Sequence, residues 1–373
     1  MKKHISYAWV FMFVIIFMSA FLTYPLLSKF MTQINIENRE KEDFPILSIK
    51  NYTEYNHLFE AWYNDALPYR DYLIQSNRKL TFYGFKESAS QSVIVGKDSW
   101  LFFNDTMPDY KRNNLYTSGQ LEALCTRLMV NQNYFHKRNI EFIVFIAPNK
   151  ASIYGESFLP SYIRRENNQS RTEQLVDYIR QNSNIKIIFP QEELIEITKE
   201  YPEYPLYFHL DTHWNYLGGY CGTKALLREL NIELPEIEEI VLEETNSPLF
   251  IWNGYDLANM MGMTGELTQD VNYEITCGSD TIINWNGDTT SDPNAFYSLC
   301  QTTSTAADHR KIMFIRDSFG SAMLPPMASE FSDIYSPHMD STIDSNTIDT
   351  IQPDVVIFEF VERGSIINIP LFE

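Results

Sequence analysis

The chain has 373 residues, of which 44% are hydrophobic and 14% aromatic, and its formal net charge is −20. This composition is typical of a globular protein and excludes a disordered or fibrous chain. The acidic charge argues against a nucleic-acid-binding surface, because phosphate binding needs clustered Lys and Arg. The length allows one large domain or two smaller ones.

The N-terminus carries a long apolar segment. Lys2 and Lys3 precede an almost uninterrupted apolar run from Ile5 to Leu27. Spanning a bilayer takes about 20 apolar residues, and a cleaved signal peptide usually has an apolar region of about 7–15 residues. The two lysines predict a cytoplasmic N-terminus and an extracytoplasmic remainder. We therefore expect residues 1–31 to be a single-pass membrane anchor with its flank, with a cleaved signal peptide as the alternative, and residues 32–50 to be a linker.

Apolar periodicity predicts the elements that follow. Helical spacing covers residues 55–85, 118–138, 170–182 and 215–230. A hairpin signal covers residues 92–103, and runs typical of buried strands are 140–147, IKIIF, KIMFI and VVIFEFV. Strands that alternate with helices predict an α/β catalytic domain over residues 51–373, with a mostly parallel sheet flanked by helices. Residues 264–308 are rich in polar residues and break the alternation, so we expect an insertion there.

Polar residues follow several of the predicted strands, at the edge where functional groups of a parallel sheet gather. These residues are Asn149, Lys150, Arg316, Asp317, Ser318, Glu359, Glu362 and Arg363. We expect Arg316 and Arg363 to bind an anionic or hydroxyl-rich acceptor, and Lys150 is a further candidate for substrate binding. The alternative is that the two arginines form structural salt bridges with Glu359 or Glu362.

Ser318 is the candidate nucleophile. It lies directly after the apolar run 312–315 and before the small residues 320–322, which can begin a helix. A serine between a strand and a helix N-terminus is exposed, and nearby backbone N–H groups can stabilise an oxyanion. The alternative is a serine that caps the helix, which needs the same location.

The presence of Asp211 and His213 favours a nucleophilic role for Ser318 over a helix-capping role. A serine hydroxyl needs a base to remove its proton, and a carboxylate fixes the tautomer of a histidine base. The Asp-x-His spacing places both side chains on one short loop. The alternative is that Asp211 or Thr212 caps the following helix and that His213 packs in a turn. His338 is the best rival as a base for Ser318.

No other chemistry is indicated. The Asp-x-His pair has no H-x-x-x-H or Cys-rich partner, and no phosphate-binding glycine-rich loop is present. We therefore expect no metal and no cofactor. The cysteines form no C-x-x-C pair. We expect Cys277 and Cys300 to form a disulfide, which an extracytoplasmic location allows, and Cys125 and Cys221 to be buried thiols.

Six segments together resemble the DHHW proteins, which are related to AlgJ and AlgX of alginate O-acetylation. In chain order they are VIVGKDSWLFF, FIAPNKASIY, LDTHWNYLGG, DLANMMGM, IRDSFGSAMLP and PDVVIFEFVER. They are spread across most of residues 40–373. The resemblance implies an SGNH-hydrolase-like fold and a Ser/His/Asp acyltransferase that receives acetyl groups from a membrane-bound O-acyltransferase and moves them onto an exported polysaccharide.

The same resemblance assigns roles to residues. Ser318 matches the nucleophile, His213 the base and Asp211 the orienting acid, while Asn149 is a candidate for the asparagine of an oxyanion hole. Thr212 stands where the family's name motif has a histidine, and we expect its side chain to point away from the base. We also expect no carbohydrate-binding module after the catalytic domain.

The sequence therefore predicts a membrane-anchored, extracytoplasmic O-acetyltransferase that acts on polysaccharide through an acetyl-serine. The alternatives are an esterase with the same three residues and water as acceptor, and a non-catalytic scaffold of a polysaccharide export complex. Aromatic residues around the site would favour the transferase. Trp214 is the main candidate for such a substrate contact, followed by Trp252, Tyr255 and Trp285, with core packing as the alternative for all of them.

Overall fold

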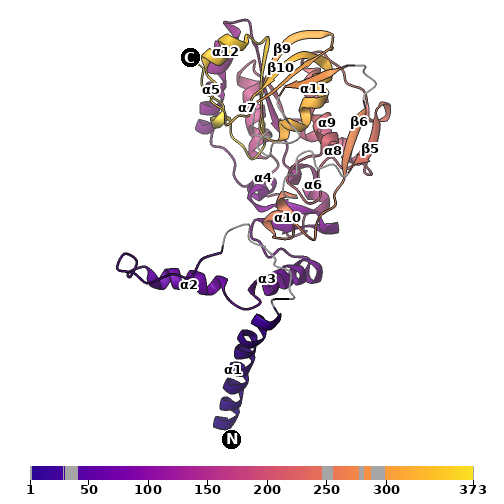
Figure 1. The fold of residues 1–373 in the computed structure, drawn as a ribbon. Coiled ribbons are helices and arrows are strands. Elements are labelled where there is room, and N and C mark those ends of the chain that lie inside the picture. Colours follow the sequence, from indigo (N-terminus) through magenta and orange to yellow (C-terminus); the bar gives the residue numbers. More distant parts are fainter. Residues whose placement is uncertain are drawn as a thin grey trace. The chain divides into compact units, whose positions relative to one another are not determined.

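The computed structural model describes residues 2–27, 29, 41–245, 255–276, 281–286 and 299–372 (Figure 1). The chain divides into two compact units. The first is Met1–Ala89 with Met261–Met263, and the second is Ser90–Met260 with Thr264–Glu373. The sheet and all the predicted site residues belong to the second unit, so the helices between residues 51 and 89, which we assigned to the catalytic domain, lie outside the unit that carries the site.

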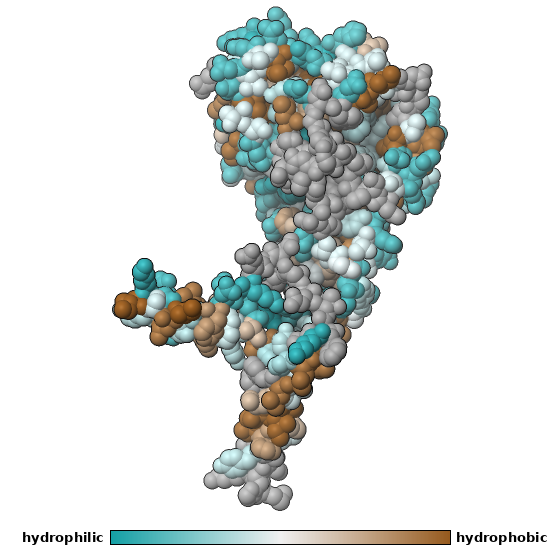
Figure 2. Space-filling model, viewed as in Figure 1, coloured by the Kyte–Doolittle hydropathy of each residue, from teal (hydrophilic) through white to brown (hydrophobic). Residues whose placement is uncertain are grey.

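The first unit is helical. Its helices are α1 (Lys2–Leu27), α2 (Tyr55–Asp65) and α3 (Arg70–Lys79), and a π-helical turn follows at Leu80–Gly84. Apolar side chains gather on α1 and around α2 (Figure 2). Within the described residues, no helix combines the length and the hydropathy that crossing a membrane requires. The predicted helix over residues 55–85 is interrupted at Tyr69, whose φ of 59° is left-handed.

A seven-stranded sheet organises the second unit, in the order β4-β3-β11-β9-β10-β8-β7. The first five strands run parallel to one another, β8 is antiparallel to β10, and β7 is antiparallel to β8. The strands are β3 (Glu141–Ala147), β4 (Lys186–Ile188), β7 (Ile283–Asn286), β8 (Cys300–Ser304), β9 (Asp308–Ile315), β10 (Phe331–Ser336) and β11 (Val355–Val361). Two small antiparallel sheets pair β1 (Val93–Val95) with β2 (Leu101–Phe103), and β5 (Val241–Thr245) with β6 (Asn272–Thr276).

Helices cover both faces of this sheet. The longer ones are α5 (Ser118–His136), α6 (Lys150–Phe158), α7 (Arg171–Asn182), α8 (Gln191–Glu200) and α9 (Tyr216–Arg228). The shorter ones are α4 (Met107–Lys111), α10 (Asp256–Met260), α11 (Leu324–Glu330) and α12 (Ser345–Ile351). In Figure 1, α5, α7 and α12 lie on one side of β9 and β10, and α9 and α11 lie on the other.

The core lies on both faces of the sheet, as the continuous apolar runs predict. Along β3, Ile143 and Phe145 pack in one buried cluster while Val144 and Ile146 pack in the other. This alternation arises because successive side chains of a strand point to opposite faces. The predicted α/β fold, with a mostly parallel sheet flanked by helices, is confirmed.

The predicted insertion adds strands to the sheet. Residues 264–308 include β6, which pairs with β5, and β7 and β8, which extend the main sheet at one edge. The thiol of Cys300 is buried and free, and its expected partner Cys277 lies outside the described residues, so the bridge stays a prediction. Trp252 also lies outside the described residues.

Close packing fixes the turn after β9, which is the 3-10 helix Phe319–Met323, against α9. A Cβ built on Gly219 would lie 2.4 Å from Cβ of Ala322 and 2.6 Å from its carbonyl oxygen. The indole of Trp214 also donates a hydrogen bond of 2.8 Å to the carbonyl of Phe319. A side chain larger than hydrogen at residue 219 would push the turn away from the helix.

We predict that Gly219→Ala lowers the free energy of unfolding by about 1–3 kcal/mol, because overpacking forces the backbone to shift. The matched control is Gly119→Ala on α5, where a Cβ meets no atom within 4 Å. That variant should gain about 0.5–1 kcal/mol from lost flexibility of the unfolded chain. Urea denaturation measures both, and equal stabilities of the two variants would contradict the packing argument.

Candidate active site

The predicted nucleophile and base are in hydrogen-bonding contact. Ser318 follows β9 and precedes the 3-10 helix, but its side chain caps no backbone N–H. Its hydroxyl instead lies 2.8 Å from Nε2 of His213. The helix-cap alternative for this serine is therefore wrong, and His338 is not the partner of its hydroxyl.

Asp211 completes the set. Its Oδ1 lies 2.6 Å from Nδ1 of His213 and also accepts the backbone N–H of that residue at 2.9 Å. Its Oδ2 accepts the backbone N–H of Asp256 at 2.7 Å. The following helix is capped by Asn215, which accepts the N–H of Gly218, so Asp211 is not a helix cap.

A tight loop brings the acid and the base together. The loop closes through an isolated bridge between Tyr207 and Trp214, and the N–H of Phe208 donates to the carbonyl of His213 at 3.2 Å. Residues 208–213, called the catalytic loop below, therefore turn back on themselves. The Asp-x-His spacing is short enough for one turn to present both side chains.

The site stabilises a charged aspartate beside a histidine. Burial raises the pKa of Asp211, but the charge of His213 and hydrogen bonds from His213 and Asp256 outweigh it and lower this pKa to about 2. Burial lowers the pKa of His213, but the charge and hydrogen bond of Asp211 and the charge of Asp256 raise it above 6.5 overall. The Asp211 carboxylate thus accepts the Nδ1 proton, which leaves Nε2 of a neutral His213 to accept the proton of Ser318.

Asp256 is part of the site and was not predicted from the sequence. Its carboxylate accepts the N–H of Thr212 at 2.7 Å and the Thr212 hydroxyl at 2.5 Å, and it lies 3.9 Å from Nδ1 of His213. The Thr212 hydroxyl is 3.4 Å from the same Nδ1, so our expectation that this side chain points away from the base is wrong. The only sequence signal for Asp256 was its place at the start of the motif DLANMMGM.

The carboxylates of Asp211 and Asp256 and the imidazole of His213 also form the one cluster with metal-ligand geometry among the described residues. Their ligand atoms lie within 4.8 Å of one another. In this structure those atoms are engaged with each other and with backbone N–H groups through the hydrogen bonds given above. The arrangement is that of a proton-transfer pair, Asp211 and His213, in a loop that the Asp256 carboxylate holds through Thr212.

Asn149 lies at the carboxyl end of β3, fully buried. Its side-chain oxygen accepts a hydrogen bond of 3.1 Å from Arg363, which also reaches the Thr212 hydroxyl at 3.5 Å and lies over the ring of Phe319. The Nδ2 of Asn149 has no hydrogen-bond partner within the described part of the chain. Because Arg363 fixes which way the amide faces, a buried N–H donor remains available beside the catalytic loop.

Three of the predicted substrate-binding residues are structural. Arg316 is 2% exposed and donates to the hydroxyls of Ser336 and Ser321. Trp214 is 1% exposed and packs in the core, and Lys150 is 4% exposed with its ammonium bound to backbone carbonyls. The predicted contacts of these three residues with substrate are therefore wrong. Arg363 is half-buried beside the catalytic loop, and its role in substrate binding stays a prediction.

The carboxylates of half-buried Asp317 and buried Glu362 join the strand ends beneath the site. Asp317 accepts the N–H of Phe319 at 2.7 Å and the N–H of Val361 at 2.7 Å, so it links the Ser318 turn to β11. Glu362 accepts the N–H of Asn149 at 2.9 Å, which links β11 to the start of α6. Burial raises the pKa of Glu362 to about 7, against the hydrogen bonds that it accepts.

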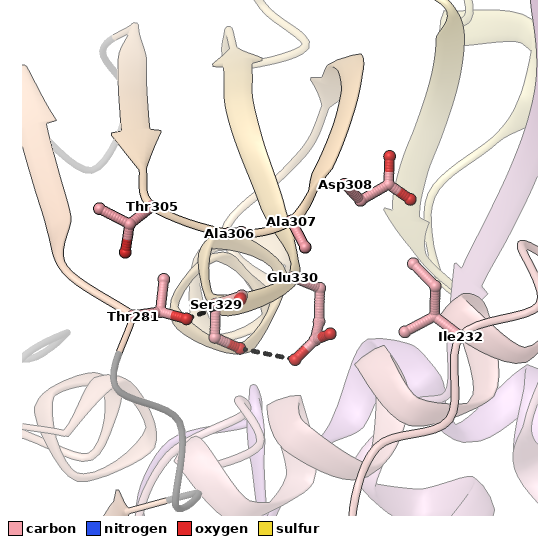
Figure 3. Close-up of a pocket in the computed structure, with 8 residues that line it drawn as sticks. All are labelled: Ile232, Thr281, Thr305, Ala306, Ala307, Asp308, Ser329 and Glu330. Carbon is pink, nitrogen blue, oxygen red and sulfur yellow. Dashed lines mark hydrogen bonds between the residues drawn. The ribbon is translucent and has the colours of Figure 1, made fainter.

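A separate polar cavity of about 500 Å³ lies at the other end of β9 (Figure 3). Its lining includes Asp308, the first residue of β9, with Thr281, Ser329 and Glu330. Ser318 lies three residues beyond the last residue of that eight-residue strand, and a strand rises about 3.3 Å per residue. The cavity is therefore remote from the Ser318 hydroxyl and does not belong to this site.

Comparison with known proteins shows what part of the second unit is similar to. Residues 93–273, which include Asp211, His213 and Asp256, match the family model described as SGNH hydrolase-like domain, acetyltransferase AlgX. No curated protein sequence matches the chain. Residues 93–273 of the second unit thus resemble the SGNH hydrolase-like domain of the acetyltransferase AlgX, and Ser318 lies beyond the matched residues.

Two solved structures, a DHHW family protein and PatB1, share this fold. A DHHW family protein from Eubacterium siraeum is 16% identical, with 75% of this chain and 95% of that chain covered and a TM-score of 0.52. PatB1 of Bacillus cereus is 15% identical, with 74% and 98% covered and a TM-score of 0.52. The O-acetyltransferase domain of Pseudomonas putida AlgJ is 16% identical, with 73% and 91% covered and a TM-score of 0.42. The resemblance to DHHW and AlgX proteins that the six motifs indicate is confirmed.

The charge of Asp256 gives a prediction about pH dependence. Asp256→Asn removes a negative charge near Nδ1 of His213, so the imidazolium loses stabilisation and the pKa of His213 falls. Any Ser318-dependent reaction needs neutral His213, so the acidic limb of kcat/KM should move to lower pH by roughly one unit. Hydrolysis of p-nitrophenyl acetate across pH 5–9 measures the limb.

The matched control for Asp256→Asn is Asp340→Asn. Asp340 is 85% exposed and lies 3.4 Å from His338, which is not the partner of Ser318. This variant should leave the acidic limb where it is in the wild-type protein. An unchanged limb in Asp256→Asn, or an equal shift in both variants, would contradict the assigned electrostatics.

Proposed function

We propose that this protein is an O-acetyltransferase that moves an acetyl group onto a hydroxyl of a polysaccharide through an acetyl-Ser318 intermediate. The single observation that carries the proposal is the hydrogen-bonded series Asp211–His213–Ser318. Asp211 and His213 lie in the segment that matches the SGNH hydrolase-like domain of the acetyltransferase AlgX. A serine activated by a histidine that a carboxylate orients is the arrangement that covalent acyl transfer requires.

In the first step, Oγ of Ser318 attacks the carbonyl carbon of the acetyl donor, and its proton passes to Nε2 of His213. The bond from the acetyl carbon to the donor's leaving atom then breaks, and His213 returns the proton to that atom. The products are acetyl-Ser318 and the released donor group. The Asp211 carboxylate stabilises the imidazolium that forms during the step.

In the second step, a sugar hydroxyl gives its proton to His213 while its oxygen attacks the acetyl carbon of acetyl-Ser318. The ester bond to Oγ breaks, and His213 returns the proton to Oγ. The sugar leaves as an acetyl ester and the serine is restored. If water takes the place of the sugar, the same steps give hydrolysis, and His213 is 22% exposed, which keeps the esterase alternative open.

Two N–H donors are suited to stabilise the oxyanion that forms in both steps. The Asn149 Nδ2 is buried and has no partner among the described residues, and the backbone N–H of Ser318 makes no hydrogen bond within that same set. Donors held unpaired in a buried site are worth more to a developing charge than donors in water, because they need no reorganisation.

The partners belong to the proposal as well. We propose that a membrane-bound O-acyltransferase supplies the acetyl group and that an exported or cell-surface polysaccharide accepts it. Arg363 is the proposed acceptor contact that remains, because it is half-buried and borders the catalytic loop. No cofactor is required, since the acetyl group is carried by the serine itself.

Acetyl transfer can be tested with p-nitrophenyl acetate as donor and a panel of sugar oligomers as acceptors. We expect nitrophenolate release together with acetylated sugar, and a loss of about 10³-fold or more in kcat/KM for Ser318→Ala and for His213→Ala. Ser329→Ala on α11 is the control and should behave as wild type. Nitrophenolate without acetyl-sugar would favour the esterase, and turnover that survives Ser318→Ala would contradict both enzyme proposals.

We also propose that the apolar run of α1 holds the catalytic unit at the outer face of the cell membrane. The support is in the sequence, namely Lys2 and Lys3 followed by apolar residues 5–27. The full chain should stay in the membrane fraction after an alkaline wash, and a variant lacking residues 1–31 should be released. Recovery of the intact full chain in the soluble fraction would contradict this proposal.

A further inference from the structure

The backbone of the catalytic loop is bound from both sides by charged side chains. On one side, carboxylates accept its N–H groups. Asp270 accepts the N–H of Leu210 at 2.7 Å, and Asp256 accepts the N–H of Thr212 at 2.7 Å. On the other side, the ammonium of Lys150 donates to its carbonyl oxygens. Each residue from 208 to 212 thus has a backbone N–H or carbonyl group that is hydrogen-bonded to a charged side chain.

Lys150 makes three hydrogen bonds to this loop. Its Nζ lies 3.0 Å from the carbonyl oxygen of Phe208, 3.1 Å from that of His209 and 2.6 Å from that of Asp211. An ammonium has three donors, so all of them are used. The last of these bonds holds the residue whose carboxylate orients His213.

The environment of Lys150 is buried and acidic. Aromatic rings of Trp100 and Phe102 lie 5.7 and 5.4 Å from its Nζ. The carboxylates that act on it are Asp270, Asp256 and Asp211, and the imidazoles of His209 and His213 belong to the same loop. Within the described part of the chain, no carboxylate comes close enough to Lys150 to form an ion pair. Its positive charge therefore interacts with the carboxylates of Asp270, Asp256 and Asp211 together and not with one of them alone.

We propose that Lys150 is a positioning residue for acetyl transfer, whose ammonium fixes the catalytic loop so that Asp211 and His213 face Ser318 and balances the negative charge of the acids around that loop. This inference rests on the proposed function, because positioning has a meaning only for a reaction at Ser318. Lys150 itself touches no reacting atom.

Two consequences distinguish a positioning role of the Lys150 ammonium from a purely structural role of its side chain. Without the ammonium, the acids around the loop are no longer balanced, so the pKa of His213 should rise and the acidic limb of kcat/KM should move to higher pH. Burial also lowers the pKa of Lys150 to about 8, against the charges of Asp270, Asp256 and Asp211. Above that pH the amine is neutral and has two donors for three carbonyls, so activity should fall.

The experiment uses the full chain with Lys150→Met, Lys150→Arg and a matched control, Lys224→Met. Lys224 is also a buried lysine, but it lies on α9, where it pairs with Glu236 and donates to the carbonyl of Pro235. For each protein we would measure kcat/KM for p-nitrophenyl acetate against pH, and the titration of the His213 imidazole by NMR.

We expect Lys150→Met to lose about 10²-fold in kcat/KM, which is the cost of a small misplacement of a catalytic group, and to raise the pKa of His213. Lys150→Arg should lose the alkaline limb near pH 8, because a guanidinium does not titrate there. Lys224→Met should keep the wild-type rate and both limbs.

The proposal is overturned if folded Lys150→Met keeps the wild-type rate and the wild-type pKa of His213. Should that variant fail to fold, Lys150→Arg decides, since an alkaline limb that persists in it cannot arise from residue 150. If wild-type protein shows no Ser318-dependent turnover, the proposed function fails. The NMR titration of His213 in Lys150→Met then still tests whether Lys150 controls the loop.

Discussion

The site depends on one constraint, which is that buried charges of both signs bind the backbone of a single short loop. Lys150 binds carbonyl oxygens of this loop, and Asp256 and Asp270 bind its N–H groups. A buried charge is costly unless it is hydrogen-bonded and balanced by opposite charge, so each of these groups requires the others. The loop is therefore held before any substrate arrives, and preorganised dipoles of this kind are what stabilise charge that develops during a reaction.

Much of the fold follows from local sequence. The nearly continuous apolar runs of β3 and β11 can be satisfied only by a sheet that is covered on both faces, and helices alternate with these runs along the chain. The pairing of Asp211 with His213 was predictable because two residues of one turn need no knowledge of the fold. Ser318 was predictable because parallel strands end at one edge, which brings the turn after β9 toward the loop that carries His213.

The rest of the site depends on contacts that no local pattern encodes. Asp256 lies 45 residues beyond Asp211 in the sequence, so its hydrogen bonds with the loop appear only in three dimensions. A residue that follows a strand can be placed at one edge of the sheet from the sequence, but the direction of its side chain cannot. Arg316 and Lys150 both occupy such positions and both turn inward. The polar residues of β7 and β8 suggested an insertion because edge strands lack the apolar signal of central ones.

The measurement that tests this account most directly is the site of acetylation after a single turnover. Wild-type protein would be mixed briefly with an acetyl donor and no acceptor, quenched in acid, digested and analysed by mass spectrometry. The account predicts one acetyl group on Ser318, its loss when an acceptor sugar is added before the quench, and its absence in His213→Ala. Acetylation confined to other residues, or an acetyl-Ser318 that forms equally well without His213, would contradict it.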